Sequence, residues 1–219
     1  LKDNSELKNK ISVIDRWWDR QDYTELWAKL IEKKFREFTN THSLKDQEVL
    51  ILYSAHSLPE AYCLEKGDRY NQEIQGSIEN IERKLKEIGL RHNHALGWQS
   101  KVGPKRTKWL SPSTPEVIEK TEEKAILIVP IAFTTDHIET LDEIDIEFRE
   151  YVEDAGKLFS RADCFNLENA FIQLCSKLVH EHMTESYESC IRPCCENCVG
   201  KDCAAMREFF SSDPVYYQD

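Results

Sequence analysis

Features that would assign the chain to a simple functional class are absent or scarce. No apolar run among the 219 residues reaches the length of about 18 that a membrane span requires. No secretory or transit peptide is visible, and there is neither a GxGxxG fingerprint nor a P-loop. With only 7 glycines, 7 prolines and 40% hydrophobic residues, the composition excludes collagenous and disordered classes and fits a globular domain.

Basic residues are also in deficit. The chain has 29 Lys and Arg against 40 Asp and Glu, which gives a formal net charge of −11. Such a surface repels polyanions, so neither nucleic acid nor an anionic membrane is expected as the main partner. A cationic substrate, such as a metal ion, suits this charge better.

Cysteines are concentrated near the C-terminus. Five of the eight fall within 14 residues, at Cys190, Cys194, Cys195, Cys198 and Cys203. A disulfide-stapled secreted domain would spread its cysteines more widely, whereas dense C-x-x-C spacing indicates metal or cluster binding in a reducing compartment. We therefore predict a lobe over residues 1–185 and a short cysteine-rich extension over 186–219.

Apolar runs alternate with amphipathic segments along the lobe. Strands are predicted at 49–53, 94–101, 125–133 and 157–163. Helices are predicted at 22–38, 70–88, from 115, at 137–154 and at 167–183. Pro130 fits the middle of a strand poorly and indicates a bulge or the strand end. This order predicts an α/β fold with a parallel four-stranded sheet flanked by helices.

A first polar segment, SAHSLP, follows the apolar run 49–53 directly. Sites in open α/β sheets form at the carboxyl ends of strands. His56 is the one side chain of this segment that titrates near neutral pH, so it is a candidate base. The alternative is an ordinary loop histidine.

A second polar segment follows the run 125–133. If residues 136–147 are helical, one face carries Asp136, Glu139, Glu143 and Glu147. The other side of that helix would carry Ile138, Leu141, Ile144 and Phe148. The adjacent His137 adds an imidazole, and carboxylate with imidazole binds divalent transition metals. The alternative is a solvated acidic face.

These segments resemble the ferrochelatases, the terminal enzymes of haem synthesis. The resemblance rests on IDRWW (14–18), SAHSLP (54–59), YNQEI (70–74), WQSKVGP (98–104) with Trp109-Leu110, and VPIAFTTDHIETLDEIDIEF (129–148). The C-x2-C-x4-C tail followed by Phe209-Phe210 is similar to the C-terminal extension of animal-type members. The likeness covers nearly the whole chain, although the loop 105–108 is about two residues longer than the family pattern.

The resemblance implies insertion of Fe²⁺ into protoporphyrin IX, which yields protohaem and two protons. It assigns His56 as the proton acceptor and Glu139 as the carboxylate partner opposite it. It places an acidic path for the metal at Asp136 and Glu143. It also places His137 on this path, as a residue that binds the substrate. The remaining porphyrin contacts that it implies are Leu58, Pro59, Val102 and Trp109, an apolar and aromatic wall suited to a flat ring.

The resemblance also implies a [2Fe–2S] cluster. Cys195, Cys198 and Cys203 match three of its thiolate ligands, and such clusters need four. The fourth is expected in a segment upstream of Leu1, although Cys190 or Cys194 could replace it. A zinc knot or free thiols are the alternatives.

The same likeness makes this chain the C-terminal half of a two-lobed enzyme, and we expect the isolated chain to be nearly inactive. It further implies a homodimer attached peripherally to the mitochondrial inner membrane, on the matrix side. Two other functions stay open, namely a non-catalytic haem- or porphyrin-binding relative and a cobalt or nickel chelatase of the same fold.

Overall fold

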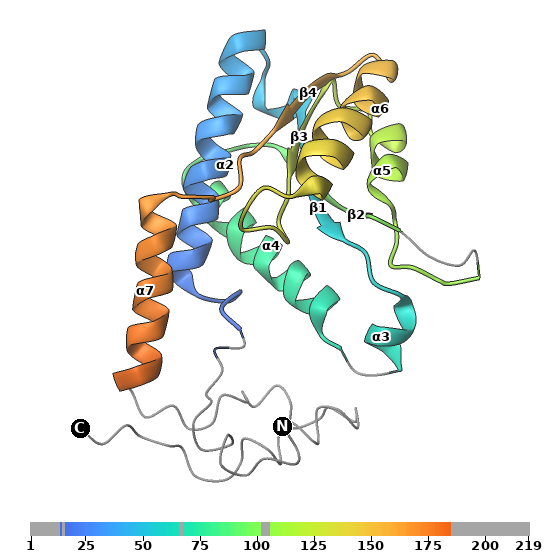
Figure 1. The fold of residues 1–219 in the computed structure, drawn as a ribbon. Coiled ribbons are helices and arrows are strands. Elements are labelled where there is room, and N and C mark those ends of the chain that lie inside the picture. The colour runs from blue at the N-terminus through green and yellow to red at the C-terminus, as the bar shows by residue number, and fades with distance from the viewer. Residues whose placement is uncertain (1–13, 15, 66–67, 102–105, 185–219) are drawn as a thin grey trace.

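A computed structural model describes residue 14 and residues 16–65, 68–101 and 106–184 of the chain. The described part is an α/β lobe built on a sheet of order β2-β1-β3-β4 (Figure 1). All three pairings in this sheet are parallel, which confirms the predicted fold class. The strands are β1 (Val49–His56), β2 (Asn93–Gln99), β3 (Ala125–Val129) and β4 (Leu158–Arg161).

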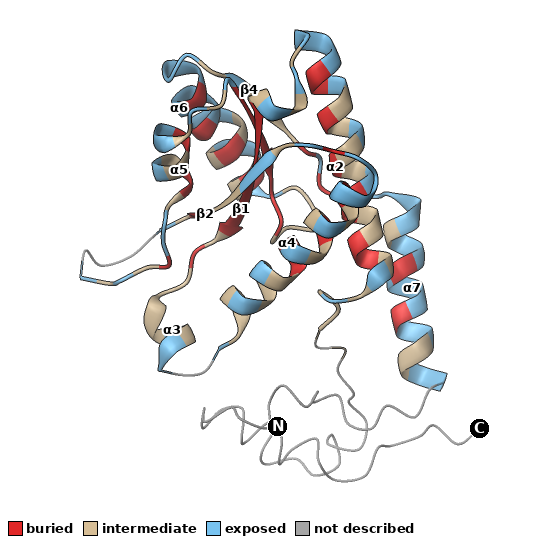
Figure 2. Ribbon diagram, turned by 180° about the vertical axis from the view of Figure 1, so that it is seen from behind, coloured by how far each residue is buried: buried red, intermediate tan, exposed pale blue. Residues whose placement is uncertain are grey.

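The central strand β1 is buried on both faces because helices cover both sides of the sheet. Residues alternate between the faces along a strand, so Ile51 and Tyr53 enter one apolar cluster while Leu50 and Leu52 enter the other. Strand β3 is likewise buried over all its residues, seen in red at the centre of Figure 2. It ends at Val129, so Pro130 follows the strand rather than interrupting it.

The larger cluster packs the sheet against three long helices, α2 (Gln21–His42), α4 (Tyr70–Glu87) and α7 (Asn169–Thr184). Trp27, Ile31 and Phe35 of α2 are fully buried there, and so are Ile81 and Leu85 of α4. The four-residue spacing of these side chains fits the amphipathic period seen in the sequence.

The smaller cluster covers the opposite face with α5 (Thr114–Lys120), a π-helix η2 (Glu139–Phe148) and α6 (Arg149–Asp154). Two short elements complete the described chain, the 3₁₀ turn η1 (Asp46–Glu48) and α3 (Glu60–Leu64). Within the described residues, no helix is both long and apolar enough to cross a membrane.

The helix predicted over 137–154 differs from the expectation in its winding. Residues 139–148 form the π-helix, and the α-helix that continues it covers 149–154. The predicted buried face is also partly wrong, because Ile138 and Leu141 are 70% and 52% exposed. The residues buried instead repeat every four positions, at Thr140, Ile144 and Phe148, which is the stripe that the wider π-helical turn aligns.

Candidate functional site

The candidate site lies at the carboxyl end of the sheet, where β1 and β2 finish side by side. His56 is the last residue of β1, and its partner in the parallel ladder is Gln99, the last residue of β2. Ligand sites in open α/β sheets form outside this edge. The predicted candidate base is therefore placed where a site is expected.

The His56 ring is oriented by the backbone that follows it. Its Nδ1 lies 2.8 Å from the carbonyl oxygen of Ser57. A carbonyl can only accept, so Nδ1 carries the proton and donates, and in the neutral ring Nε2 keeps its lone pair. The Tyr70 hydroxyl donates to the His56 carbonyl oxygen over 3.0 Å and fixes the backbone from α4. The half-buried ring is thereby set up to accept a proton at Nε2.

Gln99 links this histidine to the acidic helix. Its side chain is 1% exposed, and its Nε2 donates to the Glu139 carbonyl oxygen at 3.1 Å and to Glu143 Oε2 at 3.0 Å. Its Oε1 accepts from the buried Ser54 hydroxyl at 2.6 Å. One residue thus pairs with His56 in the ladder and also holds the first turn of η2. Glu139 is brought to the same edge of the sheet as His56.

Ser100 reinforces this connection. Its backbone N–H donates to Glu143 Oε1 at 2.7 Å, and its hydroxyl donates to Glu143 Oε2. Ser100 has a φ of 59°, the left-handed region that L-residues adopt at a cost. Strain of this kind is retained where the surroundings fix the conformation, and here the Glu143 carboxylate does so. Both oxygens of Glu143 are therefore occupied by protein donors.

The Glu139 carboxylate is different. Glu139 is the first residue of η2 and is half-buried, and no group among the described residues donates to its carboxylate oxygens. Its position in the first turn places the negative charge near the positive end of the helix dipole. Within the described chain, this carboxylate remains available to a proton or a cation.

Asp136 is held by a cation and an amide. Arg161 Nη1 lies 3.0 Å from its Oδ1, and Asn166 Nδ2 donates to Oδ2 at 2.7 Å. Partial burial alone would raise the pKa of the Asp136 carboxyl, but the hydrogen bond from Asn166 and the charge of Arg161 outweigh it and keep this pKa below its usual range. Arg161 also pairs with Asp145 of η2, at 2.7 Å from Nε to Oδ1. Asp136 is thus part of an ionic anchor between β4 and η2.

His137 lies at the exposed entrance to η2. Its Nε2 is 3.0 Å from the Thr135 hydroxyl, and its ring contacts Phe133. The backbone N–H of His137 donates to the Thr140 hydroxyl at 2.7 Å, while that hydroxyl donates back to the His137 carbonyl at 2.8 Å. These bonds satisfy groups that the start of the helix would leave unpaired.

The predicted apolar wall is assembled beside His56. Pro59 and Trp109 form an antiparallel bridge, and the Leu110 N–H donates to the Leu58 carbonyl at 3.0 Å. Leu58, Pro59 and Trp109 are all half-buried, so each keeps apolar surface at this edge. Val102 lies outside the described residues, as do Cys195, Cys198 and Cys203.

Sequence reasoning missed three residues that build the site, namely Gln99, Ser100 and Arg161. The first two lie within WQSKVGP, which carried the family resemblance, but neither of them was given a role there. A polar Gln-Ser pair at the end of an apolar strand was the available signal, because buried polar side chains need partners. Arg161 had a similar signal, as a cation at the end of β4.

The fold and the site together define an α/β protein with an oriented imidazole and an available carboxylate at the carboxyl edge of a parallel sheet. The sequence profile of the ferrochelatase family matches residues 1–183. The chain is 39% identical over 214 residues to "Ferrochelatase, mitochondrial" of Bos taurus, covering 94% of this chain and 49% of that protein. This chain belongs to the ferrochelatase family.

Relatives outside animals are similar. "Ferrochelatase-2, chloroplastic" of Hordeum vulgare is 37% identical over 166 residues, covering 74% of this chain and 33% of that protein. "Ferrochelatase" of Gloeothece citriformis is 36% identical over 189 residues, covering 83% of this chain and 46% of that protein. The chain therefore spans half or less of the length of these curated relatives.

Proposed function

We propose that this chain carries the catalytic groups of a ferrochelatase, which inserts Fe²⁺ into protoporphyrin IX to form protohaem. The observation that carries the proposal is the orientation of His56, whose Nδ1 donates to the Ser57 carbonyl and leaves Nε2 as a base. The Gln99 contact with the Glu139 backbone adds a carboxylate at the same edge. Family membership supports the assignment.

In this proposal, Fe²⁺ replaces two pyrrole N–H protons of the porphyrin, so two protons must leave for each ion inserted. His56 Nε2 accepts a proton from a pyrrole nitrogen, and Glu139 accepts or passes on the other. A neutral imidazole is suited to this step because its unprotonated ring nitrogen has a lone pair that can accept a proton.

Glu139 is the carboxylate that we assign to meet the iron first. Ligation by Asp136 or Glu143, which the resemblance implies, would require each to exchange a protein donor for the ion, since Arg161, Gln99 and Ser100 hold them. We propose that these two residues fix η2 in position and enter the metal path after such an exchange.

The porphyrin would lie against Leu58, Pro59 and Trp109, with Val102 and His137 at its border. A flat apolar macrocycle matches this half-buried surface, since apolar area removed from water is the main source of its affinity. The pairing of segment 58–60 with 108–110 holds these side chains together before any ligand binds.

Further parts of the assignment rest on the family and on the relatives. The coverage of half or less supports a second lobe outside this chain, and the names of the Bos taurus and Xenopus laevis relatives support a mitochondrial location. An animal-type [2Fe–2S] cluster at Cys195, Cys198 and Cys203, a homodimer and attachment to the matrix side of the inner membrane complete the proposal. Iron and sulfide analysis with visible absorption, in the protein as its gene encodes it and in its C198S variant, tests the cluster.

The test of the function is metal insertion by the same gene-encoded protein carrying His56→Ala, with His180→Ala as the control. His180 is exposed on α7, far from the proposed chemistry in the chain. We expect the His56 variant to lose at least about a hundredfold in kcat, because general-base catalysis contributes that much or more. Quenching of the protein's fluorescence by added porphyrin should show that the His56 variant still binds porphyrin. Undiminished turnover in His56→Ala would overturn the assignment.

A further inference from the structure

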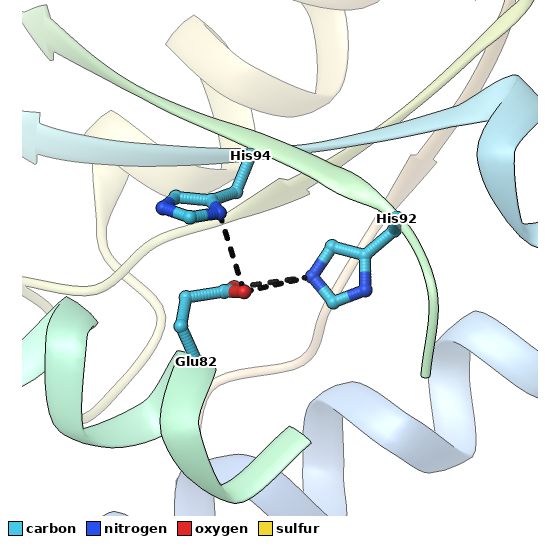
Figure 3. A group of neighbouring side chains, drawn as sticks. All are labelled: Glu82, His92 and His94. Atoms are coloured by element: carbon cyan, nitrogen blue, oxygen red, sulfur yellow. Dashed lines mark hydrogen bonds and ion pairs between the residues drawn. The ribbon is translucent and has the colours of Figure 1, made fainter. Parts of the chain in front are cut away.

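Three potential metal ligands meet on the α4 side of the sheet, away from the site described above. Glu82 lies on α4, His92 directly precedes β2, and His94 is the second residue of β2. Figure 3 shows both imidazole rings directed at the Glu82 carboxylate. Because alternate residues of an extended segment share a face, the His-x-His spacing brings both rings to the same helix.

The distances between the donor atoms are close to those of a metal site. His92 Nε2 lies 3.0 Å and His94 Nδ1 lies 3.3 Å from Glu82 Oε2, and one ligand atom from each residue lies within 4.8 Å of the others. With bonds of about 2.1 Å, neighbouring ligands in a tetrahedral zinc site are about 3.4 Å apart. Small side-chain movements would therefore admit an ion among these three groups.

The surrounding contacts orient the cluster. The Tyr53 hydroxyl donates to Glu82 Oε1 at 2.6 Å and steadies the carboxylate from β1. Outer contacts of this kind are what hold metal ligands in place. The His92 side chain is only 3% exposed, and its Nδ1 has no hydrogen-bond partner among the described residues. Without an ion, Nε2 donates to the Glu82 carboxylate at 3.0 Å, so an ion would replace that proton while the unpartnered Nδ1 carries the proton of the neutral ring.

An ion could reach the cluster from solvent through His94, whose side chain is 47% exposed. The cluster is separate from the candidate catalytic site, because His94 pairs with Ile51, five residues before His56 along β1. At about 3.3 Å per strand residue, this separation is roughly 16 Å. The two sites therefore differ in both position and ligand set.

We propose that Glu82, His92 and His94 form a binding site for a divalent transition-metal ion of the zinc type. Two imidazoles and one carboxylate suit Zn²⁺, Fe²⁺, Ni²⁺ and Cu²⁺ far better than Mg²⁺ or Ca²⁺, which prefer oxygen ligands alone. Three protein ligands leave a fourth position for water. The bound ion would join α4 to β2 and stabilise the lobe.

The surface hollow that contains the three proposed ligands is also lined by Arg83, Lys86 and Arg91. These cations oppose the approach of a metal ion, so we expect micromolar rather than nanomolar affinity. The alternative is a plain histidine–carboxylate pair that takes no metal.

The test is calorimetric titration of the whole chain with Zn²⁺, together with the Tm with and without Zn²⁺. We compare wild type with His94→Ala and Glu82→Gln, and the glutamine can still accept the Tyr53 hydrogen bond. His180→Ala is the matched control, and Mg²⁺ tests selectivity. The cysteine tail contributes equally to every variant, so the difference in stoichiometry reports this cluster.

We expect wild type and His180→Ala to bind one more equivalent of Zn²⁺ than either cluster variant, and to gain roughly 5 °C in Tm at saturation. The difference in Zn²⁺ stoichiometry should persist when His56→Ala is added to wild type and to each cluster variant. The result is therefore independent of the proposed chelatase function. Equal stoichiometry and equal Tm shifts in wild type and Glu82→Gln would overturn the site, even if His94→Ala failed to fold. An equal response to Mg²⁺ would overturn the assigned class of ion.

Discussion

Gln99 and Glu143 join the end of a strand to the middle of a π-helix, with 3.0 Å between the amide Nε2 and the carboxylate Oε2. The bond is partly buried, because Gln99 is buried whereas Glu143 is half-buried. Ser54 completes the chain of hydrogen bonds from inside the sheet. The relative position of His56 and Glu139 thus depends on a residue to which the proposed chemistry gives no role.

Gln99→Met should destabilise the lobe by about 2 kcal/mol, because methionine has a similar shape but leaves the Ser54 hydroxyl and one Glu143 oxygen with fewer partners. Urea unfolding measures this free energy. Gln75→Met, on the exposed face of α4, should be nearly neutral. If the two variants unfold at the same urea concentration, the Gln99 network contributes no net stability.

Ser100→Gly should be more stable than Ser100→Ala by about 1 kcal/mol. Both variants lose the hydroxyl bond to Glu143, but glycine adopts the φ of 59° without the cost that alanine incurs. At Glu79, exposed in the middle of α4, the same pair of substitutions should give the opposite order, because alanine favours a helix over glycine. Thermal unfolding of all four variants checks this, and alanine being the more stable at both positions would contradict it.

Asp22→Asn should lower stability by about 1 kcal/mol at neutral pH, a value reduced for solvent screening. Arg20 holds Asp22 with two hydrogen bonds, at 2.9 and 2.8 Å, and Lys177 of α7 lies 3.0 Å from the same carboxylate. The hydrogen bonds from Arg20 outweigh the opposing effect of burial and lower the pKa of Asp22 well below its usual range.

The sign of the pH effect follows from this lowered pKa. A carboxylate with a depressed pKa in the folded state contributes stability above the unfolded value of about 3.9, and loses it as the pH falls further. The difference between wild type and Asp22→Asn should therefore be constant above about pH 5 and shrink below pH 4. Glu37→Gln, exposed on the same helix, serves as the control. A difference that grows on acidification would refute this account.

Cys175 should react with iodoacetamide at pH 8 about a thousandfold faster than Cys164 in the folded protein. Cys175 is exposed on α7, whereas burial, aided by the Asp136 charge, raises the pKa of the Cys164 thiol to about 12. Peptide mapping by mass spectrometry gives both rates, and in denaturant they should become equal. Comparable rates in the native state would show that Cys164 is not protected as described.

The sheet could be predicted because its strands carry a strong local signal. The runs 49–53 and 125–129 are apolar at every position, and burial on both faces of a parallel sheet requires this. The winding of 139–148 was not predicted, since π- and α-helices differ in which backbone groups pair and not in the residue types that they accept. Only the four-residue spacing of Thr140, Ile144 and Phe148 carried that information.

The candidate site could be predicted in position but not in detail. His56 and Glu139 were located because they follow strands whose carboxyl ends share one edge. The partners of Asp136 and Glu143 come from β4 and β2, and no local pattern indicates which distant donor a carboxylate will meet. The cluster of Glu82, His92 and His94 escaped notice for the same reason, because helix and strand contribute its ligands separately.

The four-residue repeat of η2 has a consequence for which length changes this segment can accept. Loops between elements absorb single insertions and deletions, but removal of one residue between Glu139 and Glu143 would turn the first carboxylate by about a quarter of a turn around the helix axis relative to the second. Gln99, which contacts both residues, could then reach only one of them. Natural variation in length should therefore fall outside these ten residues, in the turns before and after them.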